Sequence, residues 1–137
     1  MARSGWKRWI VAGGALTALA LSVTAGSLAQ GKWVAPEESK KLKNPVASSA
    51  KVLADAKKSF ETNCVACHGP KGLGDGVAAA GLPVKPANWT SPDTQKLTDG
   101  EIFWKITNGR GPMPPWKHLS ENERWALVHF IRTVAKK

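Results

Sequence analysis

The chain has 137 residues, 42% of them hydrophobic, with 20 Lys and Arg against 10 Asp and Glu and a net charge of +10. This length allows one ordinary domain and excludes two. The basic excess favours acidic partners, but no nucleic-acid-binding motif accompanies it, so the sequence predicts no function with nucleic acid.

Residues 1–29 have the layout of a secretory signal peptide. Basic residues precede an apolar stretch, and Ser27 and Ala29 supply small side chains where a signal peptidase would cut before Gln30. The alternative is an uncleaved membrane anchor, because residues 9–29 carry no charge over about the length that spans a bilayer. We therefore predict export to the periplasm, where thiols tend to be oxidised, with membrane association through residues 9–29 as the alternative.

Residues 30–47 mix charges with Pro36 and Pro45 and show no helical period. They are predicted to form a linker that leads into a single domain over residues 48–137. An N-terminal arm that packs on the domain through Trp33 is the alternative.

Three helices are predicted in this domain. The first begins at Ser48 or Ser49 and continues into a pair of cysteines, since its apolar residues fall on one face. The second begins with a capping box at Thr98 and ends near Asn108 and Gly109, and the third begins with a capping box at Ser120.

The connections between these helices are rich in glycine and proline, above all from Gly69 to Ser91. The pattern predicts an all-α fold of three to four short helices and long loops. Such a chain buries little apolar surface by itself, so we expect a bulky group to fill its centre.

The only two cysteines lie in Cys64-Val65-Ala66-Cys67-His68, which matches the C-x-x-C-H sequence for attaching haem c. Two residues between the thiols let them reach one porphyrin edge, and the next residue brings an imidazole under the iron. Three rivals are weaker. A redox dithiol needs a βαβ context, a disulfide over this spacing is strained, and zinc would need a distant fourth ligand, His118 or His129.

Met113 is the predicted second axial ligand of the iron. It is the only methionine besides the initiator, and it lies in the proline-rich turn between Gly111 and Pro115. The prolines stiffen this turn, which limits loss of the ligand during redox cycling. His118 and His129 are the competing ligands, and we interpret His129 as a residue of the helix surface.

The segment from Val46 to Lys137 resembles the class I monohaem cytochromes c of the small bacterial type. The resemblance rests on Phe60, four residues before Cys64, on the C-x-x-C-H sequence, and on the G-x-G-D-G loop that begins at Gly72. The sequences DGEIFWKITNG, MPPW and ERWALVHFIR complete it.

The resemblance implies a class I cytochrome c fold around one covalently bound haem c. The first and last helices would cross, so that Ala56 and Phe60 pack against Leu127 and Phe130. Many relatives have glycine at this crossing, so Ala56 would set the helices slightly farther apart.

The resemblance also implies what surrounds the haem. The free N–H of His68 would meet the carbonyl of Pro83 or Pro86, and Trp89 and Trp104 are candidates to donate to a haem propionate. The thioether edge would be exposed inside a basic rim formed by Lys71, Lys85, Arg110 and Lys117.

These observations predict an electron-transfer protein, not an enzyme. An iron held by His68 and Met113 has no open position, which favours one-electron transfer. The carrier would shuttle electrons between respiratory-chain donors and an oxidase or reductase, docking on acidic surfaces of these redox partners. The alternative is a haem c subunit or gas-sensing domain of a larger enzyme complex.

Overall fold

The computed structural model describes residues 31–135 of the chain. The chain divides into a segment Met1–Lys32 and a second unit, Trp33–Lys137. The predicted signal peptide or anchor over residues 1–29 lies outside the described residues. Within the described part, no helix has the length and apolar character needed to cross a membrane.

The first long helix, α1 (Ala50–Asn63), begins after Ser49, whose hydroxyl accepts a hydrogen bond from the amide of Val52 at 3.2 Å. It leads into the one-turn helix α2 (Val65–His68) through Cys64, which caps the end of α1 and the start of α2. The predicted helix into the cysteine pair is therefore confirmed.

Both predicted capping boxes are formed. They begin α4 (Asp99–Asn108) and α5 (Glu121–Val134), where each capping hydroxyl and the glutamate three residues on satisfy each other's backbone amides. The end of α4 also lies where the sequence places it. Gly109 caps it with φ 61°, a conformation that favours glycine.

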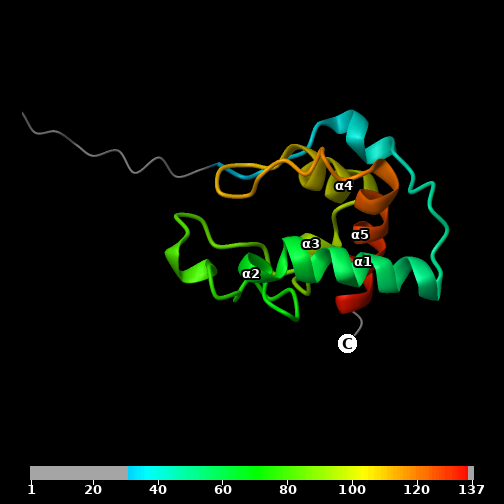
Figure 1. Ribbon diagram of the computed structural model, residues 1–137. Helices are drawn as coiled ribbons and strands as arrows, with labels where there is room; N and C mark the ends of the chain where they lie inside the picture. Colours follow the sequence, from blue (N-terminus) through cyan, green and yellow to red (C-terminus); the bar gives the residue numbers. More distant parts are fainter. Residues whose placement is uncertain (1–30, 136–137) are drawn as a thin grey trace, which may run out of the picture. The chain divides into compact units, whose positions relative to one another are not determined.

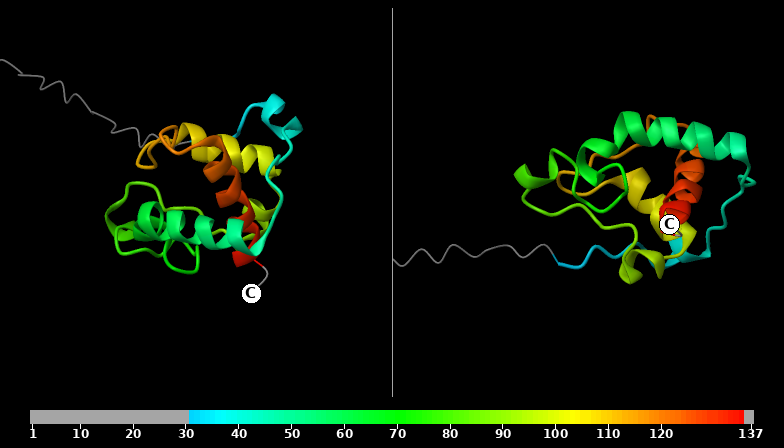
Figure 2. Two further views of the ribbon diagram at one scale, coloured as in Figure 1. Left: turned by 45° about the vertical axis from the view of Figure 1, so that its right-hand side comes forward. Right: turned by 90° about the horizontal axis from the view of Figure 1, so that it is seen from below.

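The first and last long helices cross, as the resemblance implies (Figures 1 and 2). Phe60 of α1 is buried, and its ring lies 5.0 Å from that of Phe130 in α5. Ala56 is also buried, and a small cleft of about 60 Å³ remains beside it and Ala126.

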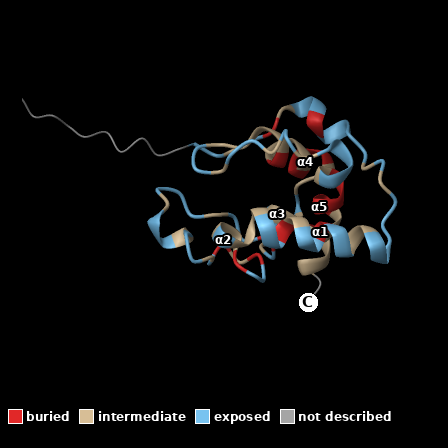
Figure 3. Ribbon diagram, in the orientation of Figure 1, coloured by how far each residue is buried: buried red, intermediate tan, exposed pale blue. Residues whose placement is uncertain are grey.

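Buried residues gather where α1, α4 and α5 meet (Figure 3). We call this set the core cluster, and it consists of Phe60, Trp89, Ile102, Ile106, Trp125, Leu127, Val128 and Ile131. Trp125 of α5 is 3% exposed within it.

Residues 33–47 form an arm that packs against α4 and α5. This agrees with the alternative that the sequence offered to a linker. The 3₁₀ helix η1 (Glu37–Lys41) buries Ser39, whose carbonyl leaves no room for a side chain at Gly100 of α4. Lys105 of α4 donates to the carbonyl of Trp33, and its ammonium lies 4.5 Å from the centre of that ring.

The end of this arm is held by α5. His129 donates from Nε2 to the carbonyl of Val46 at 2.7 Å, and Asn44 donates to the carbonyl of Trp125 at 3.1 Å. The interpretation of His129 as a surface residue is therefore wrong, because the arm half-buries its ring.

Two further short elements lie in the connections. They are η2 (Ala79–Gly81) and α3 (Pro92–Gln95), which begins after Ser91 with a proline in its first turn. Residues 31–135 contain no strand, only an isolated bridge between Arg110 and Met113. The prediction of an all-α fold is confirmed for this part of the chain.

Candidate functional site

One turn of backbone gathers the two thiols and the imidazole of the C-x-x-C-H sequence. The amides of Cys67 and His68 both donate to the carbonyl of Cys64, at 3.2 and 2.9 Å, and the amide of Cys64 donates to Phe60 of α1 at 2.8 Å. The two thiols are half-buried and are not joined by a disulfide. α1 therefore anchors the turn, and both sulfurs remain available for thioether bonds.

Burial favours the neutral forms of the Cys64 thiol and the His68 imidazole. It raises the pKa of the Cys64 thiol to about 11, with a smaller contribution from Cys67. Burial also lowers the pKa of His68, while a hydrogen bond to the carbonyl of Ala87 partly opposes the shift. A neutral imidazole is the form that binds a metal.

The hydrogen-bond acceptor for His68 differs from the one the resemblance implied. Nδ1 of His68 lies 3.3 Å from the carbonyl oxygen of Ala87, so neither Pro83 nor Pro86 is the partner. The carbonyl of Pro86 faces Gly74 so closely that a side chain at Gly74 would collide with it. With its Nδ1–H directed at Ala87, the imidazole leaves the lone pair of Nε2 for a metal.

The indole of Trp89 lies against the imidazole of His68. The two ring centres are 4.6 Å apart, and the ring planes are tilted by 32°. The sequence offered Trp89 only as a donor to a propionate. No local sequence pattern predicts this contact, because it joins the last residue of α2 to a loop residue 21 positions further along the chain.

The segment that contains Met113 lies at the same end of the unit as α2 (Figures 1 and 2). The segment 110–116 faces the α2 region in all views (Figures 1 and 2). Met113 is half-buried and packs against the core cluster, as Cys64 does. Its backbone pairs with Arg110 through hydrogen bonds of 2.8 and 3.1 Å, which close the proline-rich turn. The described chain thus offers one thioether, one imidazole and two free thiols, a donor set that suits haem c.

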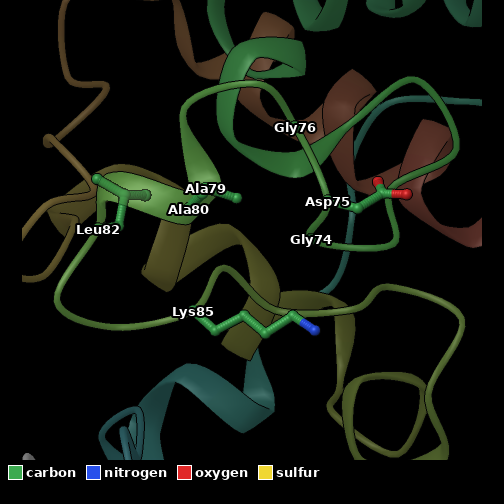
Figure 4. Close-up of a pocket in the computed structure, with 7 residues that line it drawn as sticks. All are labelled: Gly74, Asp75, Gly76, Ala79, Ala80, Leu82 and Lys85. Carbon is green, nitrogen blue, oxygen red and sulfur yellow. The ribbon is translucent and has the colours of Figure 1, made fainter.

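The loop between the cysteines and α3 forms an open pocket of about 350 Å³ (Figure 4). Asp75 and Lys85 supply its charged groups, and its apolar lining comes from Ala79, Ala80 and Leu82. None of the four predicted haem residues lines this pocket, so it is a feature of the loop surface.

The predicted basic rim is only partly exposed. Lys71, Lys85 and Lys117 are exposed, whereas Arg110 is half-buried.

The zinc alternative lacks a set of ligands within residues 31–135, where no three His, Cys, Asp or Glu side chains come together to hold a metal ion. The ring of His118 lies 5.3 Å from that of Trp116, and His129 is bonded to the arm.

Among known proteins, the cytochrome c6 of Cladophora glomerata is 33% identical over a match of 88 residues that covers 60% of this chain and 88% of that protein. The cytochrome c6 of Euglena gracilis is 32% identical over 77 residues, covering 56% of this chain and 85% of that protein. The cbb3-type cytochrome c oxidase subunit CcoP of an Azospirillum species (strain B510) is 38% identical over a match of 100 residues that covers 66% of this chain.

Two relatives are much longer than the matched region. This chain spans 31% of that CcoP subunit. It also spans 49% of a chain in the reducing HAO-like protein complex of Kuenenia stuttgartiensis, which has a TM-score of 0.60 and 27% identity over 68% of this chain.

A family model described as cytochrome c oxidase, cbb3-type, subunit III matches residues 51–131, from the start of α1 to the last residue of the core cluster. The chain therefore belongs to this cytochrome c family, which confirms the class I cytochrome c fold and implies a covalently bound haem c.

Proposed function

We propose that the chain is a one-electron carrier with a single haem c attached through Cys64 and Cys67, and with His68 and Met113 as axial ligands. Bound haem c would supply the Fe(III)/Fe(II) couple. The sequence has two cysteines in all, which is enough for one attachment site.

The observation that carries the proposal is the α2 turn. It holds two free thiols and an imidazole, and it packs on the same core cluster as Met113, the only methionine in the described part of the chain. A haem with both axial positions filled by protein favours electron transfer over binding of small ligands.

The chain's own residues would limit movement around the iron. The carbonyl of Ala87 orients His68 through Nδ1. The Met113 turn is tied to α4 where the amide of Trp116 donates to Ile106 at 3.1 Å. Ligands that keep their places in both oxidation states keep the reorganisation on electron transfer small.

We infer that redox partners dock beside the loops that carry the exposed lysines. Lys71, Lys85 and Lys117 are exposed, and complementary acidic surfaces would speed association in a salt-sensitive manner. Membrane oxidases, reductases or dehydrogenases are the partner classes that we propose.

The length of two relatives favours a second candidate, a haem c subunit of a larger complex. The match to CcoP covers only 31% of that protein, and the HAO-like neighbour is part of a complex. Purification of the untagged protein from gently solubilised membranes separates the two candidates. A shuttle would elute alone, and a subunit would co-elute with stoichiometric partners.

We also propose that residues 1–29 export the protein to the periplasm and are removed there. The mature protein should then begin at Gln30 in N-terminal sequencing of material from the native export pathway. A chain that still carries residues 1–29 and pellets with membranes would instead indicate an uncleaved anchor.

Absorption spectra of the holoprotein and of Met113→Ala test the haem ligands. The wild type should show c-type bands that resist acid-acetone extraction, and the ferric form should show the weak long-wavelength band of sulfur-to-iron charge transfer. Met113→Ala should lose that band and bind carbon monoxide when reduced, because one axial position opens.

His118→Ala is the matched control, since His118 is a competing ligand five residues beyond Met113. It should keep the charge-transfer band. Retention of the band in Met113→Ala, or ready carbon monoxide binding by the ferrous wild type, would contradict the proposed ligation.

A further inference from the structure

We propose that Trp89 is a positioning residue for the proximal histidine and helps to set the reduction potential. The inference rests on the proposed function, because it takes His68 as an axial ligand. It goes beyond that function by assigning control of the ligand's orientation and surroundings to a residue outside the C-x-x-C-H sequence.

Trp89 is buried, and its indole packs beside the imidazole of His68. Its side chain is 6% exposed, and its ring contacts the imidazole on one side and the ring of Phe60, 5.3 Å away, on another. Two contacts therefore restrain the imidazole. The indole packs against its ring, and its Nδ1 donates a hydrogen bond to the carbonyl of Ala87, two residues before Trp89. One short stretch of chain thus supplies both constraints on the ring.

The backbone of Trp89 is held from two sides. Its amide donates to the carbonyl of Gly72 at 2.7 Å, and its carbonyl accepts from Nε2 of Gln95 at 2.5 Å. Gln95 is in turn bonded by Arg132 of α5, which donates to its backbone and side-chain oxygens at 3.1 and 3.2 Å. Hydrogen bonds through Gln95 thus connect Trp89 to Arg132 of α5.

This arrangement has two consequences for a bound iron. A fixed imidazole plane fixes the orientation of the ligand orbitals. Residues that contact a metal ligand, without binding the metal themselves, adjust the properties of the metal in this way. The apolar indole also keeps water from the proximal side, and burial of the iron favours its less charged ferrous form.

The test compares the holoprotein with Trp89→Leu, Trp89→Phe and Trp125→Leu. Trp125→Leu is the matched control, because Trp125 is an equally buried tryptophan of the core cluster that stacks on Phe103. Measurements are the reduction potential and two reporters of ligand orientation in the ferric form, the electron paramagnetic resonance g values and the spread of the haem-methyl proton shifts.

In Trp89→Leu we expect altered g values and methyl shifts. We also expect a ferric-to-ferrous ratio raised about three- to tenfold at fixed ambient potential, where tenfold corresponds to ~59 mV for one electron. Trp89→Phe should stay near the wild type, since a ring remains beside His68. Trp125→Leu should lose comparable stability and leave both readouts unchanged.

Equal readouts in Trp89→Leu and Trp125→Leu, with the wild type still showing the sulfur-to-iron band, would overturn this inference and leave the proposed function standing. Loss of low-spin haem c from the wild type itself would instead refute the proposed function. If Trp89→Leu does not fold, Gln95→Ala provides the test, because it removes one of the two hydrogen bonds that hold the backbone of Trp89 and keeps the ring. A wild-type potential and wild-type g values in that variant would contradict the inference.

Discussion

Gly72 shows how a single position without a side chain shapes the surroundings of His68. Its φ is 67°, and a Cβ there would lie 2.7 Å from Cε3 of Trp89. The carbonyl of the same residue accepts the amide of Trp89. Glycine is therefore required twice at this position, once for the backbone angle and once for the close approach of the indole.

Replacement of Gly72 by alanine should destabilise the protein and displace Trp89. A left-handed backbone and an overpacked contact together predict a loss of about 2–4 kcal/mol in the free energy of unfolding. Denaturant unfolding of the holoprotein measures it. Gly81→Ala is the control, because nothing lies within 4 Å of a Cβ at Gly81. Equal stability of the two variants would show that this packing is not tight.

The sequence predicted the residues of the site better than their contacts. Cys64, Cys67 and His68 form a local pattern, and one turn of helix brings them together. The partner of the His68 ring lies 19 residues away, and which carbonyl it meets depends on how the loop passes Gly74. Spacing carries no information about such a contact.

At the scale of the elements, capping residues at the helix ends determine where the long helices begin. Ser120 accepts from the amide of Glu123 at 3.3 Å, and the Glu123 carboxylate accepts from the Ser120 amide and hydroxyl at 2.9 and 2.7 Å. These bonds span three residues, which is why the start of α5 could be read from the sequence. η1 and α3, with five and four residues, are too short to show a helical period.

Removal of the α5 cap should weaken the protein in a pH-dependent way. Ser120→Ala should cost about 1 kcal/mol at pH 7. Hydrogen bonds from Ser120 hold the pKa of Glu123 below its ordinary value of 4.5. This contribution is therefore fully present above pH 4.5 and is lost as the pH falls through the lowered pKa of the folded state.

The measurement is the urea midpoint of the wild type and of Ser120→Ala at pH 7 and at pH 3. The difference between them should shrink at the lower pH. Ser120→Thr keeps the hydroxyl and should behave like the wild type. A difference that stays constant with pH would mean that the carboxylate takes no part in the cap.

On the scale of the whole molecule, the charge distribution predicts how small redox reagents react. Lys85 is exposed in the loop beyond the cysteines, whereas Lys43 is exposed in the arm that precedes α1. At about 0.1 M ionic strength the screening length is about 10 Å, so only charges near the haem edge affect the rate.

Lys85→Glu should therefore slow oxidation of the ferrous protein by the anion hexacyanoferrate(III) severalfold and speed oxidation by a cationic cobalt complex. Stopped-flow absorbance measures both rates. Lys43→Glu makes the same change of charge far from the proposed edge and should leave both rates unchanged. Equal effects of the two variants would place the reactive edge elsewhere. Both effects should vanish near 1 M salt, where the screening length is about 3 Å.

The sequence by itself determined the helix ends, the all-α class and the residues that suit haem c, because each depends on groups within a few positions of one another. The tertiary structure decided how distant segments meet. It packs the arm on α4 and α5 through bonds that join residues 72 and 83 positions apart, and it sets Trp89 against His68. Such contacts depend on the summed packing of the whole unit, in which apolar burial and satisfied polar groups select one arrangement among many that share the same local pattern.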